Sequence, residues 1–201
     1  MSKILYIKAN AKPDNISRTF KISNSFIEAY KQYHPGDEII TLDLYKENIK
    51  FLTGDDINAV FGPKTEESKN HPIIKYAYQF AEVDKYVIAE PMWNLNIPAI
   101  LKAYIDYISM VGITFKYTAS GAVGLLQNKK AVNIVARGGD YSHEPHNSFE
   151  MGDRYLRTIL GFFGITDFST ISANKLDVQG ENVDEIVGKA IREAQELAKN
   201  F

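Results

Sequence analysis

Three short segments of the chain carry residue types suited to holding an anion and a flat ring. ANAKPDNISRT at 9–19 ends in two hydroxyls and an arginine. PMWNLNIP at 91–98 holds the chain's only tryptophan between two prolines, and ARGGDY at 136–141 holds a glycine pair. Each segment follows an apolar run, which predicts a loop at the end of a buried strand.

The first segment places Ser17, Arg18 and Thr19 where a helix is expected to begin. A helix N-terminus offers free N–H groups and a partial positive charge, so it binds phosphate well. The hydroxyls could donate to phosphate oxygens, and Arg18 adds charge. Ser17 could equally serve only as a helix N-cap. Neither a G-x-G-x-x-G fingerprint nor a Walker loop is present.

The other two segments have features that suit a planar heterocycle. The prolines stiffen 91–98, so its backbone could face a ring edge, with Trp93 beside the ring and Asn94 offering a donor and an acceptor. Gly138 and Gly139 would let the backbone approach a ligand closely or take positive φ. The plainer alternatives are a core Trp93, an Asn94 that caps the next helix, and an ordinary glycine turn. Together the three segments predict a mononucleotide cofactor, and FMN is the first candidate.

The elements that would position these segments alternate along the chain. Strands are predicted at 3–9, 37–44, 84–91, 130–137 and 165–172. Helices are predicted at 17–33, 65–82, 98–109, 148–164 and 181–200, the second mainly after Pro72 and the third with Pro98 as its first helical residue. Residues 110–126 look like a short hairpin.

This alternation indicates an α/β chain built from right-handed βαβ units. We expect a flavodoxin-like three-layer fold, with a five-stranded parallel sheet of order 2-1-3-4-5 and helices on both faces. Residues 1–201 are predicted to form a single FMN-binding domain. Ligands of such sheets bind beyond the carboxyl ends of the strands, which is where the three segments would meet.

The composition of the chain excludes several classes of function. The chain has 201 residues, a net charge of −2 and no cysteine. The absence of cysteine excludes disulfides, thiolate metal sites and a cysteine nucleophile. The near-neutral charge gives no reason to expect nucleic acid or an anionic membrane as partner, and no apolar stretch is long enough for a membrane span. We expect a cytoplasmic protein without a metal site.

At these motifs the chain resembles the FMN-dependent NADH-azoreductases, a family of flavodoxin-like quinone reductases related to the NAD(P)H:quinone oxidoreductases. The resemblance runs from MSKILYIKAN and SRT through PMWNLNIPAILKAYIDYISMVGITFKYTASGAVGLLQNKKA to ARGGDY and LGFFGITD. It implies bound FMN and NADH as co-substrate. The expected turnover is ping-pong: a hydride passes from NADH through FMN to a quinone, or to an azo bond that is reduced to amines.

The resemblance also implies the site residues and a homodimer. No side chain would be catalytic, because the flavin carries the chemistry. The substrate pocket would include Tyr117, Tyr141 and Phe162, in part across the dimer. The cofactor would lie against Asn10, Ser17, Arg18, Thr19, Pro91, Met92, Trp93, Asn94, Leu95, Ala136, Arg137, Gly138 and Gly139.

The sequence departs from the family pattern at five of these positions. Relatives often have serine where Asn10 and Ala136 stand, and tyrosine is common in place of Trp93. Some relatives carry an aromatic residue at Leu95, which would alter substrate stacking. Some have histidine at Tyr141, so a histidine role in protonation does not carry over.

From sequence alone, several other side chains have more than one possible role. Arg137 could stabilise the charge of reduced flavin, together with backbone N–H groups of 91–95 and 137–139, or it could form a structural ion pair. His143 and His146 lie in a polar stretch and are expected to be solvated. An apolar helix end could form a dimer contact or intrachain core; it comprises Tyr104, Tyr107, Ile108, Met110 and Val111.

Three other functions share the predicted fold. A flavodoxin-type electron carrier would usually be shorter and more acidic than this chain. A reductase for iron or chromate would differ only in its acceptor. A regulatory nucleotide-binding domain would bind without a yellow chromophore. The natural acceptor is not specified by the residues, and quinones are the better physiological expectation because azo dyes are synthetic.

Overall fold

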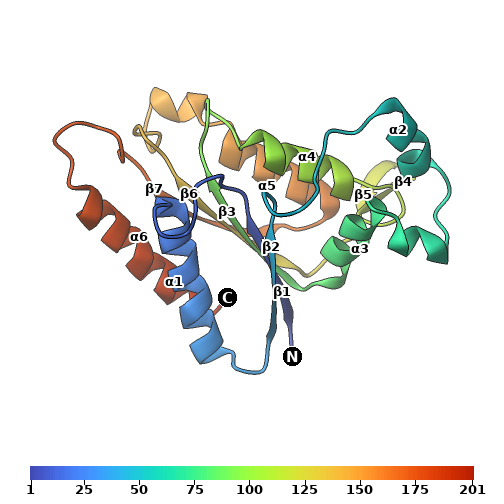
Figure 1. Ribbon diagram of the computed structural model, residues 1–201, viewed down its shortest axis with the longest axis horizontal. Coiled ribbons are helices and arrows are strands. Elements are labelled where there is room, and N and C mark those ends of the chain that lie inside the picture. The colour runs from blue at the N-terminus through green and yellow to red at the C-terminus, as the bar shows by residue number, and fades with distance from the viewer.

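The computed structural model describes all residues from 1 to 201 as an α/β sandwich around one main sheet (Figure 1). The strands are β1 (Lys3–Lys8), β2 (Glu38–Asp43), β3 (Lys85–Pro91), β6 (Lys130–Ala136) and β7 (Asp167–Ala173). They pair in parallel in the order β2-β1-β3-β6-β7, which is 2-1-3-4-5 among the sheet strands. The predicted fold class is confirmed.

Helices cover both faces of this sheet (Figure 1). On one face, α1 (Arg18–Tyr33) and α6 (Val183–Ala198) pack on a core that includes Phe26 and Val87. On the other face, α3 (Ile74–Glu82), α4 (Ala99–Ile108) and α5 (Gly152–Phe163) cover a larger core around Tyr104. Because the central strands are buried on both faces, they read as continuous apolar runs in the sequence.

The excursion after α4 is the expected hairpin. Strands β4 (Phe115–Thr118) and β5 (Gly121–Gly124) pair antiparallel beside α5. Gly124 is required there, since a Cβ would lie 2.2 Å from the backbone carbon of Phe163. The hairpin therefore docks by backbone contact against the end of α5.

The boundaries of several elements differ from the sequence prediction. Residues 65–82 divide into η1 (Glu66–Asn70) and α3, consistent with the break expected at Pro72. Pro98 is the N-cap of α4 and not its first helical residue. The predicted 148–164 helix begins later, at Gly152, after η2 (His146–Phe149), and the last strand begins two residues later than expected.

One helix was missed altogether, α2 (Gly54–Phe61). Its signal is a capping box, in which Thr53 accepts from the Asp56 backbone N–H and the Asp56 carboxylate accepts from the Thr53 N–H. A Thr-x-x-Asp pair is a recognisable helix start. The apolar side chains of α2 are mostly exposed, with only Val60 buried, which left no clear helical periodicity to detect.

Candidate functional site

A cleft of about 260 Å³ lies at the carboxyl edge of the sheet. Its walls come from the loops that follow β1, β3, β6 and β7. Sequence analysis predicted the first three loops; the fourth was missed, although its strand ends beside β6. The lining residues are Asn10, Lys12, Ile16, Arg18, Thr19, Pro91, Met92, Trp93, Ala136, Arg137, Gly138, Leu176 and Asp177.

The N-terminus of α1 opens into this cleft. Ser17 is its N-cap, accepting from the Phe20 N–H at 3.1 Å and from Asn10 Nδ2 at 2.8 Å. The capping interpretation of Ser17 is therefore confirmed. Thr19 is different: its Oγ1 is buried, lies at the cleft and has no hydrogen-bond partner. The backbone N–H groups of Arg18 and Thr19 donate to no backbone carbonyl, as expected for a first helical turn.

A buried ion pair lies beside this helix end. The first turn of α1 contains no acidic side chain that would oppose an anion there. Lys8, at the end of β1, is buried, and its Nζ contacts the two Asp14 oxygens at 2.6 and 2.7 Å and lies 4.3 Å from the centre of the Phe20 ring. The ammonium and Asn24 hold the pKa of the Asp14 carboxyl below its usual range. This ion pair fixes the loop before the helix.

The loop after β3 is a tight reversal. Trp93 and Asn96 exchange both backbone hydrogen bonds, at 2.9 and 3.0 Å, around a two-residue turn at Asn94 and Leu95. Both turn residues have positive φ, 49° and 69°, which matches a type I′ turn. Positive φ is unusual for leucine, so the backbone here is strained. Trp93 is 38 % exposed and Asn94 does not cap α4, so the two plainer interpretations are wrong.

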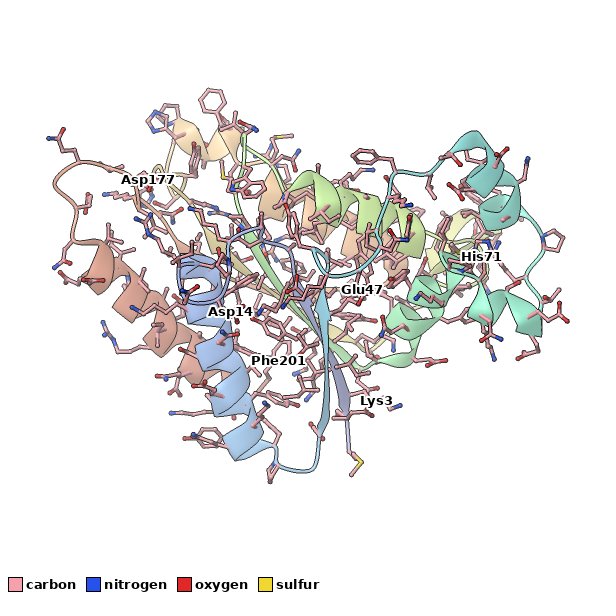
Figure 2. All side chains as sticks on the ribbon, viewed as in Figure 1. Lys3, Asp14, Glu47, His71, Asp177 and Phe201 are labelled. Carbon is pink, nitrogen blue, oxygen red and sulfur yellow. The ribbon has the colours of Figure 1, made fainter.

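The loop after β6 is held by the loop before α6. The N–H groups of Lys175, Leu176 and Asp177 donate to the carbonyls of Gly139, Arg137 and Gly138 in turn. Neither glycine has positive φ, and a Cβ at Gly138 would lie 2.6 Å from Asp177 Oδ2, the end of an exposed side chain that could move aside. Figure 2 shows Asp177 and Asp14 on the loops that precede α6 and α1.

The two ring-edge loops, defined as 91–96 and 136–139, join each other and leave four N–H groups free. Met92 N donates to Ala136 O at 3.0 Å and Arg137 N donates to Ala173 O at 2.8 Å. No backbone carbonyl accepts from the N–H groups that remain, those of Asn94, Leu95, Gly138 and Gly139. Of the N–H groups expected to face a flavin, those of Met92, Trp93 and Arg137 are thus already engaged.

Comparison with known proteins identifies the family to which this chain belongs. A family model described as "Flavodoxin-like fold" matches residues 2–198. The chain belongs to this flavodoxin-like family. Curated relatives named FMN-dependent NADH:quinone oxidoreductase are 71 % identical in Clostridium beijerinckii and 65 % in Caldicellulosiruptor saccharolyticus, each over 201 residues and the whole of both chains.

Solved structures agree with these relatives. An azoreductase from Bacillus anthracis superposes with a TM-score of 0.90 at 38 % identity over all of both chains. An FMN-dependent NADH-azoreductase from the same species, solved in complex with FMN, has a TM-score of 0.89 at 30 % identity over 98 % of both chains. The family resemblance stated from the motifs is confirmed.

The residues of this flavodoxin-like cleft fit FMN. The unpartnered Thr19 hydroxyl and the free N–H groups of α1 suit a phosphate, since a buried polar group without a partner is costly. The free N–H groups of the two ring-edge loops suit the polar edge of a flavin ring. Trp93, which is partly exposed, adds a flat aromatic surface to the lining of the cleft.

Most of the predicted cofactor residues lie on this cleft, but not all. Nine line it directly, while Ser17 lies beneath the helix end, Asn94 and Leu95 form the turn, and Gly139 follows the lining Gly138. Lys12, Ile16, Leu176 and Asp177 line it and were not predicted. Arg18 points to Asp177, with Nη1 2.8 Å from Oδ1.

Arg137 forms the structural ion pair that was one of its two interpretations. Its guanidinium Nη2 lies 3.3 Å from Glu150 Oε1, and both side chains are almost fully buried. Glu150 Oε1 also accepts from the Asp153 N–H at the start of α5, at 2.9 Å. Arg137 thus links the end of β6 to α5.

The predicted substrate residues do not meet the cleft of their own chain. Tyr117 is 69 % exposed on the hairpin, and Phe162 is 39 % exposed on α5. Both pack against Phe115, with ring centres 5.6 and 4.7 Å apart. Tyr141 lies nearer, packed against the Gly139 backbone but not lining the cleft.

The two histidines and the apolar helix end differ in their exposure to solvent. His143 and His146 are exposed, as expected for solvated side chains. Four members of the apolar helix end are buried within the chain, which confirms the intrachain-core interpretation for Tyr104, Tyr107, Ile108 and Met110. Val111 is 43 % exposed. None of the helices combines the length and hydropathy that crossing a membrane requires.

Proposed function

We propose that this chain is an FMN-dependent NADH:quinone oxidoreductase that also reduces the azo bond of aromatic azo compounds. FMN held in the cleft would supply the redox chemistry, which is hydride transfer from NADH and two-electron reduction of the acceptor. The observation that supports this most is the cleft itself, which joins a helix N-terminus to two loops with free N–H groups. The whole chain, 1–201, serves as one FMN-binding domain.

The protein's own groups bind and orient the cofactor. Thr19 Oγ1 and the N–H groups of Arg18 and Thr19 hold the phosphate, and Asn10 keeps Ser17 in place as the cap. The N–H groups of Gly138 and Gly139, with those of the 94–95 turn, face the polar edge of the ring and favour negative charge there. No side chain is needed to transfer a proton.

A matched pair of threonine variants tests the phosphate assignment. Thr19→Val should raise the dissociation constant of FMN at least about tenfold, because a hydrogen bond to a charged group contributes about 1.5–3 kcal/mol. Thr158→Val, on the exposed face of α5, is the control and should bind FMN like the unaltered protein. Fluorescence quenching of FMN by the cofactor-free protein gives both constants. Equal affinities for the two variants would remove Thr19 from the site.

We also propose that the protein is a cytoplasmic homodimer with a shared site. The exposed apolar side chains around the hairpin, among them Val111, Tyr117, Val123 and Phe162, would cover the partner's cleft and provide a flat slot for quinones. The Tyr117→Ala chain should fold normally and bind FMN, yet show a higher KM for a quinone. A monomer that binds FMN stoichiometrically and turns over normally would refute the shared site.

A further inference from the structure

Glu90 is a buried carboxyl group that FMN binding does not use. It lies in β3, directly before the first ring-edge loop, and it is 0 % exposed. Its Oε2 has no hydrogen-bond partner, and the only hydrogen bond to Oε1 comes from Asn133 Nδ2 at 3.5 Å. A buried carboxylate normally has a cation or several donors around it, so this side chain calls for an explanation.

The charged groups around Glu90 are Arg137, which follows β6, Glu150, which precedes α5, and Asp153 on α5. Each of them is already paired. Arg137 pairs with Glu150, and Arg157 pairs with Asp153 at 3.3 Å. Asp153 also accepts from Asn133 Nδ2 at 3.0 Å and from Thr170 at 2.6 Å. With one carboxylate for each arginine, Glu90 is the acidic group left without a cation.

The protonation state of Glu90 follows from this arrangement. Burial raises the pKa of its carboxyl to about 8, while Asn133 and Arg137 oppose the rise only in part. Glu90 is therefore mostly neutral at pH 7. It gains a negative charge when the solution becomes alkaline.

The same cluster supports both ring-edge loops. Glu90 is followed directly by Pro91, and its backbone pairs in register with Val135 at the end of β6. The Arg137–Glu150 pair holds the second loop to the start of α5, where Met151 N donates to Leu95 O at 2.9 Å. A charge on Glu90 would thus lie behind the backbone that faces the ring.

We propose that Glu90 is a positioning residue whose charge, behind the two ring-edge loops, sets how much more tightly the cleft holds reduced FMN than oxidised FMN. This inference rests on the proposed FMN site. Reduction adds negative charge to the cofactor, and a second negative charge in a low-dielectric interior opposes it. A neutral Glu90 leaves the cluster balanced, so reduction is favoured at neutral pH and disfavoured once Glu90 ionises.

The test compares Glu90→Gln with the unaltered protein. Glutamine has nearly the same shape and cannot ionise, so it mimics neutral Glu90. Dissociation constants are measured for oxidised FMN and, without oxygen, for dithionite-reduced FMN, between pH 7 and 9.5. The ratio of reduced to oxidised constants should be the same in both proteins at pH 7. At pH 9.5 the ratio should be about tenfold higher in the unaltered protein, which for a two-electron couple corresponds to 29.6 mV.

Two further variants test whether the pH dependence comes from Glu90 itself. Glu193→Gln removes an exposed carboxylate on α6 and should keep the pH dependence of the unaltered protein. Glu90→Met fills a similar volume without a charge and should lose that dependence, as Glu90→Gln does. If both Glu90 variants retain the unaltered pH dependence, Glu90 has no such role, although the FMN site stands. If the unaltered protein binds no FMN, the proposed function fails together with this inference.

Discussion

Lys8 and Glu90 are two buried ionisable residues at the same edge of the sheet, one on each face, and their surroundings differ. Lys8 lies against Phe20 on the α1 face, and both Asp14 oxygens contact its ammonium. Glu90 lies on the α5 face, and its Oε2 has no partner. The first group keeps a fixed, compensated charge beside the start of α1, the end of the cleft that we propose for the phosphate. The second can change its charge beneath the loops that we propose face the ring.

This difference suits the two ends of the cofactor. A phosphate keeps its charge throughout turnover, so a rigid, permanently polarised helix end is the right partner for it. A flavin ring changes its charge on reduction, so its surroundings influence the equilibrium itself. Variants at Glu90, at the Lys8–Asp14 pair, at the start of α1 and at the cleft rim test this difference.

Glu90→Gln should change how stability depends on pH. The raised pKa means that folded Glu90 keeps its proton between about pH 4.5 and 8, where the unfolded chain has lost it. The contribution of Glu90 to stability is therefore greatest below this range and falls as pH rises through it. Between pH 5 and 8 the unaltered protein should lose about 4 kcal/mol relative to Glu90→Gln, at 1.36 kcal/mol per pH unit. Urea unfolding of the cofactor-free proteins measures this, and parallel curves would contradict it.

The two halves of the Lys8–Asp14 pair should not be equivalent. Asp14→Ala leaves an ammonium that is almost fully buried without a partner, and should cost about 3 kcal/mol of unfolding free energy. Lys8→Met keeps the packing of the stem and leaves a carboxylate that is 49 % exposed, free to hydrate, so about 1 kcal/mol is expected. Urea midpoints at neutral pH distinguish the two. Equal costs would mean that the pair is not buried as described.

Variants at Ser17 and Thr19 should distinguish a residue that stabilises the fold from one that binds the cofactor. Ser17→Ala removes the N-cap of α1 and should cost about 1 kcal/mol of stability. Thr19→Val removes a hydroxyl with no partner in the chain, so stability should change by less than about 0.5 kcal/mol. Thermal unfolding without cofactor gives both values. A large loss for Thr19→Val would show that its hydroxyl has a structural partner.

The Arg18–Asp177 pair at the cleft rim should matter least for stability. Both side chains are substantially exposed, at 44 % and 73 %, so Asp177→Asn should change unfolding free energy by less than about 0.5 kcal/mol. Removing this carboxylate frees Arg18 for the phosphate, so FMN should bind a few-fold more tightly. Titration at low and high salt checks this, because the gain should shrink as salt screens the charges. Weaker binding in the variant would contradict the assignment.

Much of the fold could be predicted because its signals are local. Alternating apolar runs and helical faces gave the five strands and most helices, and the switch-point rule brought three loops together. The helix α2 was missed because it buries only Val60. The loop containing Leu176 and Asp177 was missed because nothing in its own residues predicts contact with Gly138.

The site was less predictable because its chemistry depends on distant partners. The sequence left Arg137 with two interpretations, and only its contact with Glu150, on a different element, decides between them. Glu90 looked like an ordinary member of a strand, and its burial emerges only when α5 covers that face. Tyr117 and Phe162 resemble pocket residues by motif, yet within one chain they lie away from the cleft.

The most direct test is a visible absorption spectrum of the FMN-loaded protein, followed by NADH and then a quinone, all without oxygen. We predict yellow flavin bands that bleach on addition of NADH and return when the quinone is added. Bleaching by NADH without recovery would contradict the quinone reductase. A colourless protein that takes up no FMN would show that the cleft between α1 and the two ring-edge loops is not a flavin site.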